Sequence, residues 1–149
     1  MSEPLWRLSA LEIANLIRTR EVSADEVLEH FVQRIDMLEP SLNSFVRSLR
    51  SRARKRARRL DSALAKGLQD ERAFVGVPFG VKDTEAVRMS RFHVGSRAFR
   101  WLWSPVDVPA VKRMRAMGLN FVGKTTTSEL ALQPVVETDL QPPTVNPWN

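Results

Sequence analysis

The hydrophobic residues of the first 67 positions recur every three or four residues, which is the spacing of amphipathic helices. Ser9 with Glu12 and Ser23 with Glu26 form capping-box patterns, so each pair predicts the start of a helix. We expect the second helix to end before Pro40, because proline lacks a backbone donor and clashes with the preceding turn.

A third helix is predicted from Ser48 to Lys66, with Gly67 as its C-cap. Its apolar stripe consists of Leu49, Ala53, Ala57, Leu60 and Leu64. Eight cationic residues and no acidic residue lie from Arg47 to Arg59. Because the cations fall between apolar residues at helical spacing, we favour a solvated outer face. Nucleic-acid binding through 47–59 and binding to a membrane surface stay open as weaker alternatives.

Beyond Gly67 the pattern changes to short apolar runs, at Val77–Val81 and at Asn120–Val122, which predict strands. A helix is expected between them, with Asp107 as N-cap and Gly118 at its end. Its inward residues would be Val111, Met114 and Met117. Strands that alternate with a helix predict an α/β fold.

Composition sets the class of protein. With 149 residues, 43% of them hydrophobic and 27% charged, the chain suits a single folded domain. We divide it into a helical lead-in (1–67), an α/β part (68–132) and a Pro-rich extended tail (133–149). The chain has no cysteine, no apolar run of membrane-spanning length and no secretory signal core, so a cytoplasmic location is predicted.

The octapeptide from Gly76 to Asp83 places Lys82 at the end of a strand-like apolar run. An ammonium group held among apolar neighbours loses solvation, which favours the neutral form that can act as a base. The ordinary alternative is a lysine that ends a strand in water. Further motifs follow at Gly95-Ser96, at Gly123-Lys-Thr-Thr-Thr-Ser-Glu129 and at Asn146-Pro-Trp-Asn149.

In order and spacing, these motifs resemble the N-terminal part of the amidase-signature enzymes, one branch of which belongs to the glutamyl-tRNA(Gln) amidotransferases. The resemblance runs from about Leu8 to the last residue. It implies an α/β fold made of the N-terminal helices plus the first strands and helices of the family's mixed sheet, which would be incomplete here. It also implies that Lys82 is the catalytic base of a Ser–cis-Ser–Lys triad.

The family's two serines belong to a later Gly-Ser-rich run, and these 149 residues contain no such run. The resemblance therefore implies one catalytic residue of three, and we expect these residues alone to be inactive. It implies a small-molecule amide substrate and no metal or organic cofactor. Two alternatives are a non-catalytic interaction module or amidotransferase-subunit fragment, and a chain that needs a complementing polypeptide or forms a homo-oligomer.

The sequence departs from the family pattern after Lys82. Met89 stands where a glycine is common, and Phe92 and His93 stand where threonines are common. These larger side chains are expected to change the loop and a wall of the substrate site.

Other motifs are weaker. The residues from Gly118 to Thr125 fit a phosphate-binding loop, but the helix before and the apolar residues within favour a helix cap, a strand and a turn into a further helix. We assign Asp83, Gly123 and Thr125 to structural support. His93 near Ser96 lacks an orienting acid, and the two histidines without cysteines argue against a zinc site. For Trp101 and Trp103 we expect core or inter-element packing, with a substrate wall as the alternative.

Overall fold

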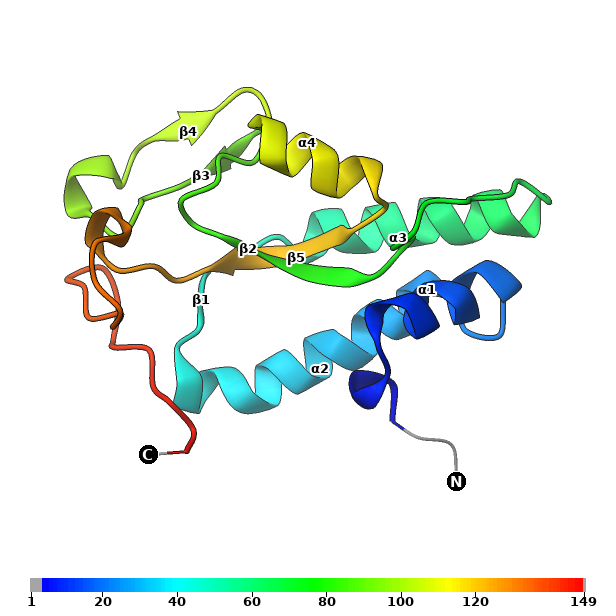
Figure 1. Cartoon of the computed structure of the whole chain (residues 1–149), viewed down its shortest axis with the longest axis horizontal. Coiled ribbons are helices and arrows are strands. Elements are labelled where there is room, and N and C mark those ends of the chain that lie inside the picture. Colours follow the sequence, from blue (N-terminus) through cyan, green and yellow to red (C-terminus); the bar gives the residue numbers. More distant parts are fainter. Residues whose placement is uncertain (1–3, 149) are drawn as a thin grey trace. The chain divides into compact units, whose positions relative to one another are not determined.

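The computed structural model describes residues 4–148 and has the expected α/β architecture (Figure 1). The helices are α1 (Ala10–Thr19), α2 (Ala24–Leu42), α3 (Arg50–Ala65) and α4 (Pro109–Ala116), and the short 3-10 helices are η1 (Leu5–Arg7), η2 (Arg97–Phe99) and η3 (Glu129–Ala131). The strands are β1 (Phe45–Ser48), β2 (Pro78–Lys82), β3 (Ser90–Arg91), β4 (Trp103–Ser104) and β5 (Asn120–Thr125).

The strands form two sheets. In the larger sheet the order is β1-β5-β2, with β1 antiparallel to β5, and in the smaller sheet β3 pairs with β4 antiparallel. Contacts divide the chain into two compact units: the first contains residues 4–35, 49–79 and 114–122, and the second contains 36–48, 80–113 and 123–148. Between residues 4 and 148, no helix is both long and apolar enough to cross a bilayer.

The first unit has an apolar core. It gathers the inward faces of α1, α3 and the first part of α2 against segments that include Val75, Val77 and Phe121. Both predicted capping boxes are present, with Glu12 N–H donating to Ser9 Oγ and Glu26 N–H donating to Ser23 Oγ. The periodic pattern thus identified the helices that build this unit.

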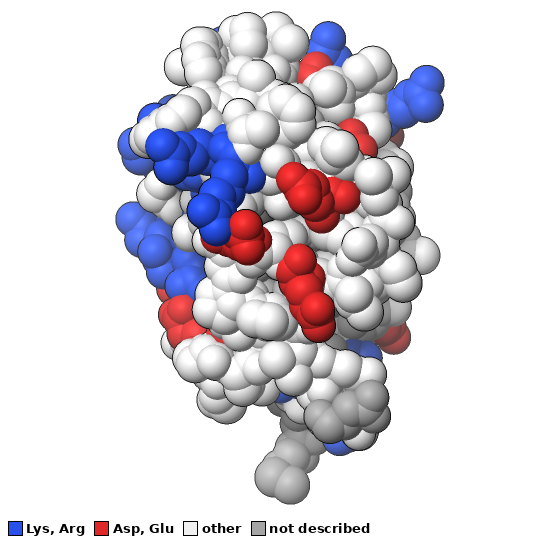
Figure 2. Space-filling model, turned by 90° about the vertical axis from the view of Figure 1, so that its left-hand side faces the viewer, with Lys and Arg blue, Asp and Glu red and all other residues white. Residues whose placement is uncertain are grey.

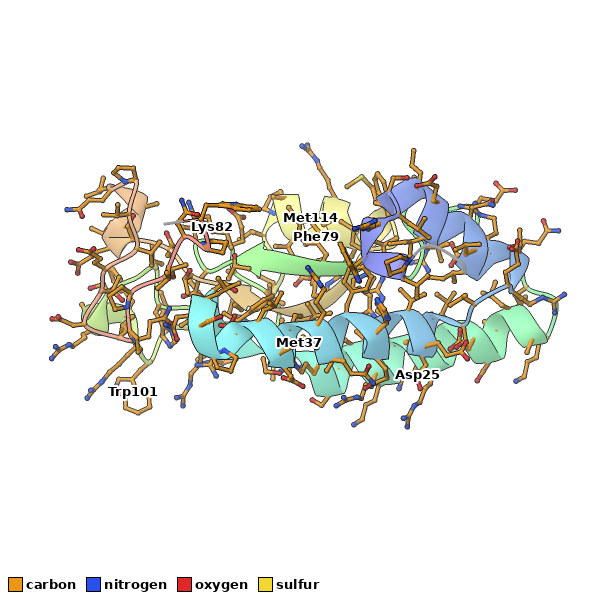
Figure 3. All side chains as sticks on the ribbon, turned by 90° about the horizontal axis from the view of Figure 1, so that it is seen from below. Asp25, Met37, Phe79, Lys82, Trp101 and Met114 are labelled. Carbon is orange, nitrogen blue, oxygen red and sulfur yellow. The ribbon has the colours of Figure 1, made fainter. Side chains whose placement is uncertain are left out.

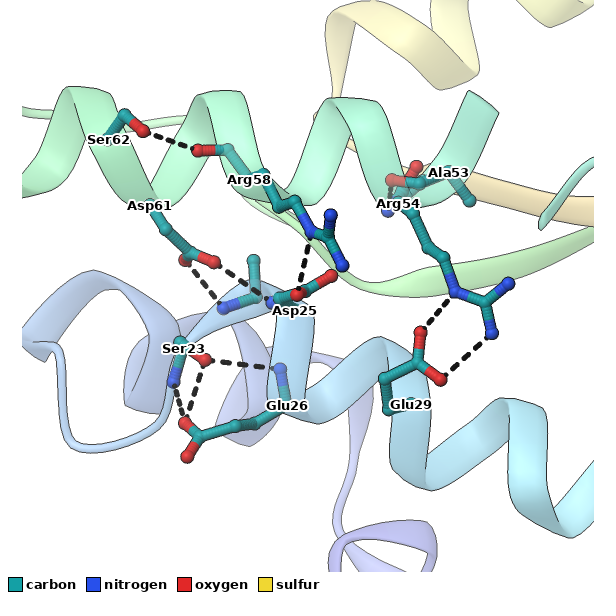
Figure 4. A network of polar contacts seen from close by, with 11 residues as sticks. Ser23, Asp25, Glu26, Glu29, Ala53, Arg54, Arg58, Asp61 and Ser62 are labelled. Carbon is teal, nitrogen blue, oxygen red and sulfur yellow. Dashed lines mark hydrogen bonds and ion pairs between the residues drawn. The ribbon is translucent and has the colours of Figure 1, made fainter. Parts of the chain in front are cut away.

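The face of α3 toward α2 is held by carboxylates (Figure 4). Arg54 Nη2 donates to Glu29 Oε2 at 2.9 Å, and Arg58 Nε donates to Asp25 Oδ2 at 3.1 Å. From α3, Asp61 accepts the backbone N–H groups of Ala24 and Asp25, at 2.7 and 3.1 Å, and so caps the start of α2. Part of the basic stretch is therefore engaged within the first unit.

Helix α2 does not end before Pro40, as predicted, but runs to Leu42 with Pro40 inside its last turn. A proline so near the end removes only one backbone hydrogen bond. The turn is kept by Asn43 N–H, which donates to Glu39 O at 3.0 Å, and by Ser41 Oγ, which donates to Leu38 O at 2.8 Å. The prediction failed because these local bonds compensate for the lost donor.

The second unit has a much more polar interior. Its buried residues include Asp83 and Lys124 as well as the hydroxyl residues Ser90, Ser96, Ser104, Thr127 and Ser128. Gly123 is required where β5 meets β1, because a Cβ atom there would lie 2.6 Å from Phe45 Cδ1 and 2.9 Å from Arg47 O. This close packing supports the structural role that the sequence suggested for Gly123.

Two further expectations are corrected. Strand β5 continues through Gly123 and Lys124 to Thr125, where a turn into a further helix was predicted, and only the 3-10 helix η3 follows. Met117 was expected to face inward but is 39% exposed, because α4 ends at Ala116 and Gly118 adopts a φ of +98° directly after it. Val111 is fully buried, as expected.

Candidate active site

Lys82 is the last residue of β2, and its side chain is exposed at the end of the strand (Figure 3). Its neighbours on either side, Val81 and Asp83, are each only 1% exposed. This alternation follows the pleat of a strand, in which successive side chains point to opposite faces. The expectation that apolar neighbours surround the Lys82 ammonium group is therefore wrong for the described residues, since the pleat turns this side chain outward.

Asp83 lies behind Lys82, inside the second unit. Its backbone N–H donates to Thr125 O at 3.0 Å, which continues the contact between the ends of β2 and β5. Its Oδ2 atom accepts the backbone N–H of His93 at 2.7 Å. One carboxylate thus fixes the start and the end of the loop that follows Lys82.

Lys124 is the functional-site residue that sequence analysis missed. It is fully buried on β5, with Nζ 3.1 Å from Asp83 Oδ1 and donating to Glu85 O at 2.6 Å. The ring of Phe92 has its centroid 5.7 Å from the same nitrogen. Burial lowers the pKa of Lys124, and the carboxylate of Asp83 opposes this effect. Had β5 been extended through Gly123, its uniformly buried pattern would have revealed a lysine in need of an acidic partner.

His93 lies on the other side of Asp83. Its Nδ1 is 3.6 Å from Asp83 Oδ2, and its Nε2 is 3.3 Å from Arg47 Nη2. Because a guanidinium group can only donate, Nε2 accepts and the proton is assigned to Nδ1, toward Asp83. Burial lowers the pKa of His93, while Asp83 opposes the shift. Charged and polar side chains therefore alternate from Lys124 through Asp83 and His93 to Arg47.

Ser96 does not form a catalytic pair with His93. Its Oγ accepts the N–H of Ala98 at 3.3 Å and caps η2, and its contact with His93 is a backbone hydrogen bond of 3.0 Å. His93 instead lines an open hollow of about 610 Å³ with Glu39, Asn43 and Gln141. Glu39 is already engaged, since its carboxylate accepts from Ser44 Oγ and from Phe45 N–H.

The backbone of this loop turns sharply three times. Met89, which stands where the family resemblance suggests a glycine, has a φ of +55°, and Val94 and Gly95 follow with φ values of +51° and +72°. A Cβ atom on Gly95 would lie 2.4 Å from Ser128 O. The loop thus keeps a conformation that favours glycine, although the sequence supplies glycine only at Gly95.

Trp101 and Trp103 are 64% and 51% exposed, so the expected core packing is wrong. Arg91 and Arg100 lie over the ring of Trp101, at 4.7 and 5.1 Å from its centroid. On the side of the molecule shown in Figure 2, cationic and acidic side chains lie next to one another. Arg97 and Asp139 form one such pair in the second unit, at 2.8 Å.

Residues 4–148 contain no group of three or more His, Cys, Asp and Glu side chains that could hold a metal ion. What the site offers is an exposed amine on a strand end, a buried carboxylate behind it and a buried lysine that pairs with that carboxylate. An amine held in this way on an α/β scaffold fits the class of hydrolases that use a lysine as their base.

The chain belongs to the amidase family. The family model described as Amidase matches residues 26–149. The corresponding chain of the glutamyl-tRNA(Gln) amidotransferase from Carboxydothermus hydrogenoformans is 33% identical over 145 residues, covering 97% of this chain and 30% of that protein. The chain thus spans about 30% of the length of this curated relative. The resemblance stated from the motifs is confirmed.

Solved structures agree on the fold. The 6-aminohexanoate cyclic dimer hydrolase complexed with substrate superimposes with a TM-score of 0.83 at 29% identity, covering 99% of this chain and 29% of that one. Fatty acid amide hydrolase superimposes with a TM-score of 0.91 at 18% identity, covering 100% and 27%, and this likeness shows the fold alone. The structure corresponds to the N-terminal part of the amidase-signature fold, with a small and incomplete part of its mixed sheet.

Proposed function

We propose that this chain is part of an amide hydrolase that acts on carbon–nitrogen bonds other than peptide bonds, with Lys82 as its catalytic base. The observation that carries the proposal is the position of Lys82, which ends β2 with an exposed amine in the motif that the amidase family shares. An exposed amine is accessible to further catalytic groups, and a segment that covers it would remove water and favour its neutral form.

The proposed reaction needs two serines besides the lysine. The neutral Lys82 Nζ would take a proton through the bridging serine while the nucleophilic serine attacks the amide carbonyl. The amine or ammonia leaves with a proton returned by the same relay, and water then hydrolyses the acyl-enzyme. Backbone donors would stabilise the oxyanion. No step in this scheme uses a metal or organic cofactor, so the expectation of none stays a prediction.

The 149 residues alone are proposed to be inactive, because they hold the lysine without the Gly-Ser-rich run that carries the serines in the family. The missing groups would come from further sequence, on the same polypeptide or on another one. The test measures amine or ammonia release from small carboxylic amides by the 149-residue chain and by the product of the whole gene locus. Turnover by the 149 residues alone that is lost in Lys82→Ala would contradict this part of the proposal.

A second candidate is a component of a larger assembly, which the similarity to one chain of an amidotransferase favours. Affinity purification from the cytoplasm, where we place the protein, followed by mass spectrometry tests this candidate. A second polypeptide recovered at equal stoichiometry would support it, and a chain recovered alone or only with copies of itself would oppose it.

Nucleic-acid binding through 47–59 gains less support. Ala53 and Ala57 are buried, and Arg54 and Arg58 face the carboxylates of α2. This arrangement favours the interpretation of α3 as a packed helix with a charged outer face. Binding of single-stranded RNA at 150 mM salt that depends on Arg52 and Arg59 would restore the alternative.

A further inference from the structure

The most unusual feature of the second unit is a lysine that no solvent reaches. Lys124 is fully buried and is the largest of the fully buried side chains. A buried ammonium group is costly unless it is paired and hydrogen-bonded. Both conditions are met, since Nζ lies 3.1 Å from Asp83 Oδ1 and donates to Glu85 O at 2.6 Å. The chain therefore devotes a buried ion pair to one place, directly behind Lys82.

Lys124 is not itself placed to be a catalytic base. Its nitrogen is enclosed by Asp83, the carbonyl of Glu85 and the ring of Phe92, and its side chain has no exposed surface. The neighbouring titratable and charged groups are Arg47, Glu85, Arg91 and His93, in addition to Asp83. A group that cannot meet a substrate can still act through the atoms that it holds.

The pair holds the residues on both sides of Lys82. Asp83 binds the end of β5 through its backbone and the N–H of His93 through its side chain, and Lys124 reaches from β5 to Glu85 O. Glu85 N–H in turn donates to Lys82 O at 3.0 Å. Each contact joins β5 or the far end of the loop to the three residues that follow Lys82.

We propose that Asp83 and Lys124 form a buried tether that positions Lys82, so that both are positioning residues and neither is catalytic. The tether fixes where β2 ends and which way the Lys82 side chain leaves the strand. The proposal rests on the proposed function only for the statement that Lys82 is the base. The tether itself is a property of the folded chain and can be measured without any substrate.

The first experiment compares backbone amide hydrogen exchange of Glu85 and His93 in the 149-residue chain and in Lys124→Met. Exchange at a hydrogen-bonded amide reports how often that bond opens. We expect at least about a tenfold acceleration at both amides, measured relative to Val27 in the first unit. Lys112→Met, which removes an exposed lysine of the same unit, is the matched control and should change neither amide.

The second variant guards against general unfolding. Asp83→Asn/Lys124→Met removes both charges, so no unpaired charge stays buried and the helices should keep their far-ultraviolet circular dichroism. Exchange at Glu85 should still be faster than in the unchanged chain, because Lys124 no longer reaches its carbonyl. Unchanged exchange at Glu85 and His93 in the double variant, or in a folded Lys124→Met, would overturn the tether.

The third measurement addresses positioning. In a form of the protein that hydrolyses amides, Lys124→Met should lower kcat at least about tenfold while KM changes less than about twofold, because only the base is displaced. An unchanged kcat would overturn the positioning role. If Lys82→Ala leaves turnover intact, the proposed function fails, but the exchange results still decide whether the tether exists.

Discussion

Replacing Gly95 by alanine should destabilise the second unit by two separable effects. Gly95 has a φ of +72°, in the left-handed region, and a Cβ atom there would lie 2.4 Å from Ser128 O and 2.6 Å from Ser128 C. These contacts are with backbone atoms, so no side-chain rotation can relieve them. Gly67 offers the matched control, since its φ is +80° and an added Cβ atom would meet nothing within 4 Å.

The two glycines allow the magnitudes to be worked out. The left-handed conformation costs a non-glycine residue about 1–2 kcal/mol, and the stiffer unfolded chain returns about 0.4–1 kcal/mol. Gly67→Ala should therefore lower the free energy of unfolding by about 1 kcal/mol. Gly95→Ala adds the cost of moving packed backbone, about 1–3 kcal/mol, and should lower it by about 2–4 kcal/mol in total.

Urea unfolding of both variants, followed by tryptophan fluorescence and circular dichroism, measures the difference between them. A comparable m-value in each variant shows that stability, and not compactness, has changed. If Gly95→Ala and Gly67→Ala agreed within about 0.5 kcal/mol, the close approach of Gly95 to Ser128 would be refuted.

Three further outcomes are expected. Asp61→Ala should cost about 1–2 kcal/mol in thermal unfolding because it removes the acceptor that caps α2, and a loss below about 0.3 kcal/mol would contradict that role. Met89→Gly should raise the free energy of unfolding by about 0.5 kcal/mol, since Met89 is 57% exposed and has a φ of +55°, and any clear loss in chemical denaturation would count against it. Because burial lowers the pKa of His93 below 6.5, the unfolded chain binds a proton there at higher pH than the folded chain, so this residue makes stability fall as pH drops from about 6.5 through the folded pKa. His93→Gln should flatten that part of the pH–stability profile, and an equally steep profile in the variant would refute the assignment.

The sequence predicted what local patterns encode. The helices of the first unit follow from apolar spacing and from the capping boxes at Ser9 and Ser23, which act within four residues. The lysine motif placed Lys82 at the end of a strand, and the structure does so too. The two-residue strands β3 and β4 escaped notice because so short a segment has no period.

Contacts between distant residues account for the rest. Asp61 caps a helix 37 positions earlier, and no local signal marks a cap that comes from another helix. Lys124 lies in a segment whose glycine and threonines are typical of a turn, so its burial became visible only when β5 paired with β1 and Asp83 came within 3.1 Å. The outward orientation of Lys82 likewise follows from the pleat of β2, which an apolar run alone does not specify.

The central claim is that Lys82 is a catalytic base, and the most direct test is amide turnover by the product of the whole gene locus. Lys82→Met is compared with Lys112→Met, a matched change at another exposed lysine of the second unit. We predict that Lys82→Met lowers kcat/KM at least about 100-fold, as the loss of a general base does, with Lys112→Met unaffected. Turnover by Lys82→Met within about threefold of the unchanged protein would contradict the account.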